Sequence, residues 1–127
     1  MNKSFFVFYV RDQEASTEFY SHTLGYDPIL NVPGMTEYEL STGCCLGLMP
    51  ATGIKSLLGE TLPDPNIGHG IPRAELYLHV EKPEEFHRRG LEAGAKELSP
   101  MQERDWGDIA GYCLDLDGHV LAFGKPI

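Results

Sequence analysis

Phe5 to Val10, FFVFYV, is an apolar run with the length and composition of a buried strand, and a short polar hinge joins it to a helix-like segment over residues 13–24. The same order returns about seventy residues later, as in an internal repeat. There, Ala74 to Val80, AELYLHV, leads through a polar hinge into a second helix-like segment over residues 84–93. Both helix-like segments stop at a glycine, the residue that most often ends a helix. The repetition therefore describes one module written twice.

Each helix-like segment is followed by short strands of similar pattern. The matching positions are Tyr38, Leu40, Leu46 and Leu48 in the first half and Tyr112, Leu114, Leu121 and Phe123 in the second, with Gly43 and Gly118 at the turns. A strand, a helix and three further strands, written twice, predict an α+β fold of two tandem β-α-β-β-β modules. We expect the modules to form a curved, open, barrel-like mixed sheet around a shared groove, where a ligand would be sought.

The boundaries of the modules follow from this pattern. Module 1 covers residues 1–50, a linker covers residues 51–71 and module 2 covers residues 72–127, and together they make a single domain. The linker is rich in glycine and proline and has little periodic pattern. Its length allows module 2 to lie beside module 1 or to cross to a partner chain, and both arrangements stay open.

Composition and charge narrow the classes of partner. The net charge of −9 disfavours nucleic acid and anionic membranes, because binding phosphate needs clustered lysine and arginine. The acidity is compatible with a cationic ligand, although a solvated acidic surface is the commoner reason for such a charge. No apolar run reaches the length of a membrane span, and the N-terminus lacks a signal-peptide pattern. Three cysteines, two of them adjacent at Cys44 and Cys45, fit a reducing compartment, so we expect a cytoplasmic protein.

Short motifs occur in a fixed order through both halves. They are Arg11-Asp12 before a helix with Glu18-Phe19-Tyr20, then Leu24-Gly25-Tyr26, residues 90–95 (GLEAGA), Trp106-Gly107 and residues 115–123 (DLDGHVLAF). In this order the chain resembles the vicinal oxygen chelate superfamily, the group of glyoxalases, bleomycin-resistance proteins and extradiol dioxygenases. The resemblance covers nearly the whole chain and implies the two-module fold. It implies no single activity, because this fold hosts several unrelated functions.

The resemblance also implies where a metal would be held. The metal enzymes of the superfamily are expected to carry one His, Gln or Glu on the first strand of each module and a Glu on the last strand of each, a donor set that suits a divalent ion. Carried over to this chain, the positions are Phe5, Glu75, about Gly47 and Ala122. Only Glu75 could bind a metal, and a register shift of one residue fits worse, since it gives Phe6, Leu76, Leu48 and Phe123. We therefore expect no metal site and no cofactor.

Because successive side chains of a strand point to opposite faces, the sequence predicts which of them would face the groove. They are Phe5, Val7 and Tyr9 from module 1 and Glu75, Tyr77 and His79 from module 2, with Glu39 and Trp106 as further ligand-binding candidates. An unpaired carboxylate is costly to bury in an apolar strand, so we expect Glu75 to pair with His79 or with a ligand cation. Trp106, in a polar loop, would be a lid over a ligand or an interface anchor.

Structural explanations compete with these roles. The two tyrosines could simply fill the barrel, His79 could donate only to a backbone carbonyl, and Glu39 could lie on an exposed strand face. Of the other histidines, His119 reads as a solvated turn residue and His87 as a helix-face residue without a spaced partner. Cys113 has no orienting base beside it in the sequence, so a nucleophilic role is not supported.

Two functions follow from these residues and from the resemblance. The first is a metal-free small-molecule-binding protein of the bleomycin-resistance type, in which a homodimer sequesters an aromatic or cationic ligand in the groove between modules. The alternative is a glyoxalase-like lyase or isomerase acting on a small carbonyl compound, with Glu75 as general base and His79 or Tyr77 as acid or electrophile. The charge, the missing metal ligands and Trp106 favour the first function over an enzyme.

Overall fold

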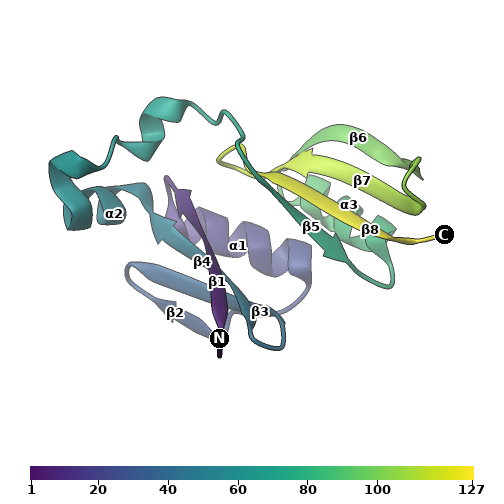
Figure 1. Cartoon of the computed structure of the whole chain (residues 1–127), viewed down its shortest axis with the longest axis horizontal. Coiled ribbons are helices and arrows are strands. Elements are labelled where there is room, and N and C mark those ends of the chain that lie inside the picture. Colours follow the sequence, from purple (N-terminus) through teal and green to yellow (C-terminus); the bar gives the residue numbers. More distant parts are fainter. The chain divides into compact units, whose positions relative to one another are not determined.

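The computed structural model describes residues 1–127 and holds eight strands and three α-helices (Figure 1). The chain divides into two compact units: unit 1 contains residues 1–21 and 26–69, and unit 2 contains residues 22–25 and 70–127. Its helices are all too short or too polar to span a membrane. The predicted α+β class and the β-α-β-β-β order of both modules are confirmed, and the strands form two four-stranded mixed sheets without a closed barrel.

Unit 1 contains the first module, apart from residues 22–25 at the end of its first helix. Its elements are β1 (Ser4–Val10), α1 (Gln13–Leu24), β2 (Leu30–Val32), β3 (Met35–Ser41) and β4 (Cys44–Pro50). The sheet order is β1-β4-β3-β2, with β1 parallel to β4 and the other neighbours antiparallel. Helix α1 has the predicted bounds, and Asp12 caps it, because its carboxylate accepts a hydrogen bond from the Ala15 amide at 3.0 Å. Phe19, Tyr20 and Tyr38 are buried in the core of this unit.

The segment predicted as a linker contains helices that the sequence pattern did not indicate. It contains α2 (Ala51–Leu58) and the short 3₁₀ helices η1 (Gly59–Thr61) and η2 (Pro65–Gly68). Ala51 and Ile54, three residues apart, bury one side of α2, and this spacing is too short to register as a helical pattern in the sequence. Lys55 Nζ donates to the carbonyl oxygens of Gly59 and Leu62 at 2.9 and 2.6 Å, which stabilises the end of the helix.

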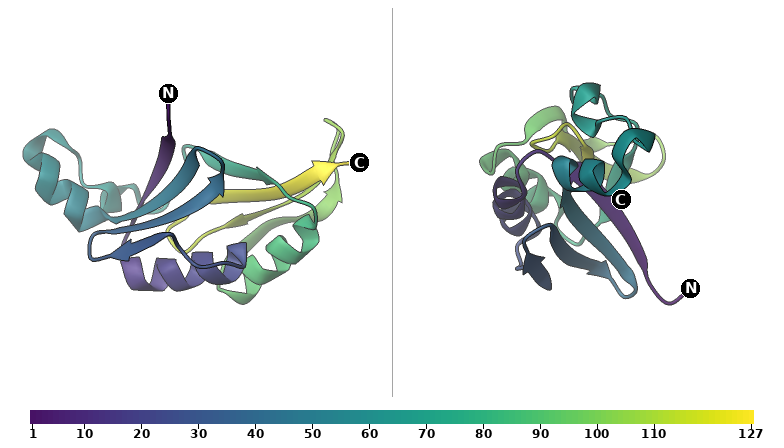
Figure 2. Two further views of the ribbon diagram at one scale, coloured as in Figure 1. Left: turned by 90° about the horizontal axis from the view of Figure 1, so that it is seen from below. Right: turned by 90° about the vertical axis from the view of Figure 1, so that its left-hand side faces the viewer.

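Unit 2 repeats the arrangement of unit 1. Its elements are β5 (Glu75–His79), α3 (Pro83–Glu92), β6 (Lys96–Glu103), β7 (Asp108–Leu114) and β8 (Val120–Pro126). The sheet order is β5-β8-β7-β6, with β5 parallel to β8. Helix α3 begins one residue earlier than predicted, with Pro83 in the first turn, where no helical partner exists for an amide hydrogen. In each unit the helix lies on one face of its own sheet (Figure 2).

The register of unit 2 assigns side chains to the two faces of its sheet. The Phe123 ring lies on the face covered by α3, with its centroid 5.7 Å from that of Phe86. Tyr77 pairs with Ala122, and Ala122 pairs with Tyr112, so these side chains share the opposite face. We call this the Tyr77 face, and its residues are Glu75, Tyr77 and His79 of β5, Val120, Ala122 and Gly124 of β8, and Asp108, Ala110, Tyr112 and Leu114 of β7.

The register also corrects the alignment of the two halves. The row of paired residues Phe6, Leu46 and Tyr38 in unit 1 corresponds to the row Leu76, Leu121 and Cys113 in unit 2. Tyr38 therefore corresponds to Cys113, and the predicted match of Tyr38 with Tyr112 is wrong by one residue. Because successive strand residues point to opposite faces, Tyr38 is fully buried in the core, whereas Tyr112 lies on the Tyr77 face.

Candidate functional site

A hydrogen-bonded cluster lies on the Tyr77 face and is centred on Asp108, the first residue of β7. Tyr77 Oη donates to Asp108 Oδ2 at 2.6 Å, and His79 Nε2 lies 2.9 Å from the same oxygen. Trp106 Nε1 donates in turn to Tyr77 Oη at 3.2 Å. We call these four residues the Asp108 network. The carboxylate at its centre is buried, with 8% of Asp108 exposed, whereas Trp106 is 55% exposed.

The network holds Asp108 in its ionised form. The hydrogen bonds from Tyr77 and then from His79 lower the pKa of the Asp108 carboxyl below its ordinary value. For Tyr77, desolvation by burial and then the hydrogen bond to Asp108 raise the pKa of the hydroxyl, so it stays protonated and donates. An ionised carboxylate only accepts hydrogen bonds, so we assign the hydrogen shared with Asp108 to His79 Nε2.

Gly124 makes room for the network. It pairs with His79 on β5 and with Ala110 on β7, directly beneath the site. A Cβ atom at position 124 would lie only 2.7 Å from Tyr77 Oη and 3.0 Å from the carbonyl oxygen of Ile109. Because real Cβ atoms do not approach so closely, a larger residue would displace the Tyr77 hydroxyl from Asp108.

Tyr112 extends the aromatic surface of the site. Its ring lies edge-on to that of Tyr77, with centroids 6.3 Å apart, and the Arg104 guanidinium carbon lies 5.2 Å from its centroid. Arg104 is fixed by hydrogen bonds to the Ala110 carbonyl oxygen at 2.9 and 3.1 Å. Burial, and next the charge of Glu75, raise the pKa of Tyr112, so its hydroxyl is a neutral group available to a ligand.

The structure brings together three of the residues predicted from module 2, namely Tyr77, His79 and Trp106, but it corrects the role expected for Glu75. Glu75 opens β5 and is exposed, so its carboxylate reaches water and needs no buried partner. The expected pairing of Glu75 with His79 is wrong, because the partner of His79 is Asp108.

Sequence reasoning missed Asp108 and Gly124. Asp108 ends the polar stretch around Trp106, but it also alternates with Ala110 and Tyr112 and so belongs to their face. Gly124 interrupts the apolar run of the last strand, and an isolated strand glycine often marks a close approach of another group. Both signals are present in the sequence, but their meaning depends on which strands lie side by side.

The residues predicted from module 1 lie in unit 1. Phe5 and Val7 are exposed on β1, and Tyr9 is half-buried. Glu39 of β3 is exposed, and Phe5 and Glu39 both pair with Cys45, so they share a face of that sheet. That these side chains and those of unit 2 line one groove stays a prediction.

The residues at the expected metal positions do not fit a metal. The register confirms that Gly47 and Ala122 are equivalent, since they pair with Val7 and Tyr77 at matching places. Together with Phe5 they provide no ligand atom in their side chains, and no group of three or more His, Cys, Asp or Glu side chains is arranged to hold a metal ion. No chemistry is therefore assigned to a metal at these positions.

The histidines and the cysteine that were set aside have structural surroundings. His87 Nε2 lies 2.8 Å from Glu97 Oε2, and His119 Nδ1 lies 2.8 Å from Asp115 Oδ2, so the expectations of a partnerless His87 and a solvated His119 are wrong. Their partners come from the next strand and from the same turn. Burial raises the pKa of the Cys113 thiol to about 12, which keeps it protonated and unreactive.

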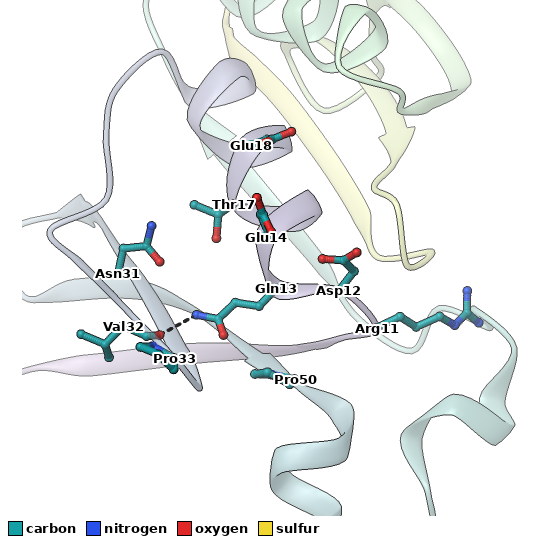
Figure 3. Close-up of a pocket in the computed structure, with 10 residues that line it drawn as sticks. All are labelled: Arg11, Asp12, Gln13, Glu14, Thr17, Glu18, Asn31, Val32, Pro33 and Pro50. Carbon is teal, nitrogen blue, oxygen red and sulfur yellow. Dashed lines mark hydrogen bonds between the residues drawn. The ribbon is translucent and has the colours of Figure 1, made fainter.

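A groove lies in unit 1, near the start of α1 (Figure 3). This groove of unit 1 has a volume of about 770 Å³, and its lining includes Arg11, Gln13, Thr17, Asn31 and Val32. Gln13 fixes its shape, because its Nε2 donates to the Val32 carbonyl oxygen at 2.8 Å. This groove has no buried ionised group with converging donors, whereas Tyr77 and His79 converge on the buried Asp108 carboxylate. We therefore prefer the Asp108 network as the candidate site.

Comparison with known proteins gives a consistent family and fold. A family model described as Glyoxalase/Bleomycin resistance protein/Dioxygenase superfamily matches residues 4–123. A solved glyoxalase-related enzyme from Fulvimarina pelagi is 22% identical with a TM-score of 0.81, over 96% of this chain and 86% of that chain. The hypothetical protein SA1046 from S. aureus is 20% identical with a TM-score of 0.79, over 98% of this chain and 94% of that chain.

A third solved structure is a glyoxalase/bleomycin resistance protein/dioxygenase family enzyme from Burkholderia phytofirmans PsJN. It is 17% identical with a TM-score of 0.76, over 98% of each chain. At such identities these structures support the fold alone. No curated protein matches the sequence.

Proposed function

Because the chain belongs to the glyoxalase/bleomycin resistance protein/dioxygenase superfamily, we propose that it binds a small organic molecule on the Tyr77 face of unit 2, without a metal. The observation that carries this proposal is the Asp108 network, in which Tyr77 and His79 converge on one buried carboxylate beside the exposed Trp106. Small-molecule sites commonly combine aromatic surface with a few converging polar groups.

The chemistry of the face favours an aromatic cation as ligand. The half-exposed Trp106 ring offers a surface for stacking, and the rings of Tyr77 and Tyr112 continue it. The ionised Asp108 and the exposed Glu75 make the face negative, in keeping with a net charge of −9. A positive ligand is attracted by this field, and a phosphate-bearing one is repelled.

We also propose that the protein is a cytoplasmic homodimer that sequesters its ligand. Strand β1 is at the edge of its sheet, and it exposes 46% of Phe5 and 54% of Phe6. An apolar edge strand of this kind pairs readily with a second copy. Light scattering on the purified chain should give the mass of two copies, and the mass of one would contradict the dimer.

Fluorescence of Trp106 provides the test of the binding site, because the chain has one tryptophan. We would titrate the protein with benzylamine, with cyclohexylmethylamine as a cation without an aromatic ring, and with benzyl alcohol as an aromatic ring without charge. We expect the strongest response to benzylamine. A protein that responds to none of the three, or equally to all, would not have the proposed site.

Two variants make the test specific. Asp108→Asn removes the charge at the centre of the network and should weaken benzylamine binding about tenfold or more, because contacts with charged groups are the stronger ones. Asp105→Asn is the matched control, since Asp105 is an exposed carboxylate in the loop that leads into Asp108. Equal weakening in both variants would point to the general charge of the loop instead of to Asp108.

The alternative, a glyoxalase-like lyase or isomerase, has no support at its expected base. Glu75 is exposed and belongs to no hydrogen bond of the Asp108 network. The pair with the properties of a base is instead His79 with Asp108.

A further inference from the structure

The contact with Asp108 leaves one ring nitrogen of His79 free to act. When the neutral imidazole carries its hydrogen on Nε2, directed at Asp108 Oδ2 2.9 Å away, Nδ1 carries the lone pair, and Nδ1 has no partner in the structure. The His79 side chain is 57% exposed, so water reaches it, whereas the carboxylate behind it is 11% exposed. A carboxylate that orients an imidazole also stabilises the imidazolium that forms when the imidazole takes a proton.

We propose that His79, positioned by Asp108, is a general base that activates water, and that the protein hydrolyses esters of phenols that carry no negative charge. This inference rests on the proposed function, since Trp106 and Tyr77 would hold the aromatic group of the ester beside His79. General-base activation requires the base to lie within hydrogen-bond reach of the water, which an exposed Nδ1 allows.

Other substrates of a water-activating base fit this face less well. Phosphate esters are anionic and would meet the charges of Asp108 and Glu75. Amides need the leaving nitrogen to be protonated while its bond breaks, whereas the oxygen of a phenol can leave first and take its proton afterwards. Abstraction of a proton from carbon is favoured by a site closed to water, and His79 is exposed. An ester with an aromatic leaving group needs none of these features.

The reaction balances without a co-reactant other than water. Nδ1 takes a proton from a water molecule while the water oxygen forms a bond to the acyl carbon, and the electron pair of the carbonyl moves onto its oxygen. The carbonyl then re-forms as the bond to the aromatic oxygen breaks and its electron pair leaves with that oxygen. The leaving oxygen takes the proton back from Nδ1, so the products are a carboxylic acid and a phenol and His79 is regenerated.

The test uses the whole chain with 4-nitrophenyl acetate as probe and follows release of 4-nitrophenol. His79→Gln should lower the rate above background about a hundredfold, the size of a general-base contribution. His22→Gln is the matched control, because His22 is also an exposed histidine beside a carboxylate, 3.4 Å from Glu92. Asp108→Asn should lower the rate and displace the pH at which it levels off, which a purely structural residue would not do.

Two further measurements distinguish the proposed mechanism from the alternatives. A general base predicts slower hydrolysis in D₂O and no acetyl group on His79 in the mass spectrum. Acetyl-His79 would show a nucleophile instead, and equal rates in His79→Gln and wild type would overturn the role of His79 altogether. Hydrolysis of 4-nitrophenyl phosphate at a similar rate would contradict the assigned substrate class.

Binding is measured separately, so that the two proposals can fail independently. The uncleaved amide 4-nitroacetanilide should quench Trp106 fluorescence in wild type and in His79→Gln alike. Quenching without His79-dependent hydrolysis overturns the catalytic inference and leaves the binding site intact. Hydrolysis that depends on His79 without any quenching supports the base and contradicts binding beside Trp106.

Discussion

The first strands of the two units, β1 and β5, occupy the same place in the fold, but at matching positions β1 carries an apolar side chain and β5 a polar one. Strand β1 presents Val7 opposite Gly47, and β5 presents Tyr77 opposite Ala122. In unit 1 the space above the small residue is filled by Met35, because a Cβ at Gly47 would lie 3.1 Å from the Met35 sulfur. Unit 1 therefore closes this space with an apolar side chain.

Unit 2 places its polar groups two residues further along the partner strand, over Gly124 and not over Ala122. Tyr9 of β1 pairs with Met49, whereas the equivalent residue of β5, His79, pairs with Gly124. Only the glycine leaves room for the Tyr77 hydroxyl to reach Asp108. The repeated sequence pattern gives both units the same backbone arrangement. Whether a polar network forms depends on the size of one residue of the neighbouring strand, Gly124 in unit 2 against Met49 in unit 1.

The largest difference in stability between the two units should appear when one methyl group is added to a glycine of each. Gly124→Ala places a carbon 2.7 Å from Tyr77 Oη and 3.0 Å from a backbone oxygen, so we expect a loss of about 1–3 kcal/mol in the free energy of unfolding. Gly47→Ala meets a flexible methionine side chain and should cost less. Chemical denaturation measures both, and an equal cost would show that position 124 has no special role.

Removing the hydroxyl of Tyr38 and that of Tyr112 should change the stability of the protein by different amounts. Tyr38 Oη donates to the Thr17 carbonyl oxygen at 2.8 Å in the core, so Tyr38→Phe should cost about 0.5–1.5 kcal/mol of stability. Tyr112→Phe removes a hydroxyl with no such bond and should leave stability nearly unchanged. If thermal unfolding gave the same loss for both variants, the corrected alignment of the two halves would be wrong.

These residues also show how much the sequence could predict. The strand of residues 5–10 and the helix of residues 13–24 could be located because their signals are local: apolar runs, a polar hinge and a terminal glycine. The order of elements in both modules followed from the repetition of these signals.

The centre of the candidate site could not be predicted in the same way. Asp108 acts together with Tyr77 only because β8 lies between their strands with Gly124 beneath the hydroxyl. That arrangement depends on the register of three strands, and a shift of one residue reverses every side chain, as the mismatch of Tyr38 and Tyr112 shows.

Lowering the pH should lower the folding stability of unit 2, because Asp108 loses its charge. The pKa of Asp108 is lowered in the folded state, so its contribution to stability is complete above the ordinary unfolded value and is lost as the pH falls through the folded one. The difference in melting temperature between wild type and Asp108→Asn should therefore be larger at pH 7 than at about pH 3. A difference that stays constant or grows in acid would contradict the ionised network.

The most direct test of the central claim is an NMR map of which backbone amides shift when benzylamine is added. The account predicts that the shifts gather in unit 2, at Tyr77, His79, Asp108 and Gly124, and that they shrink in Asp108→Asn. Shifts gathered instead at Gln13, Thr17 and Asn31 would place the ligand in the groove of unit 1 and contradict the claim that the Asp108 network is the binding site.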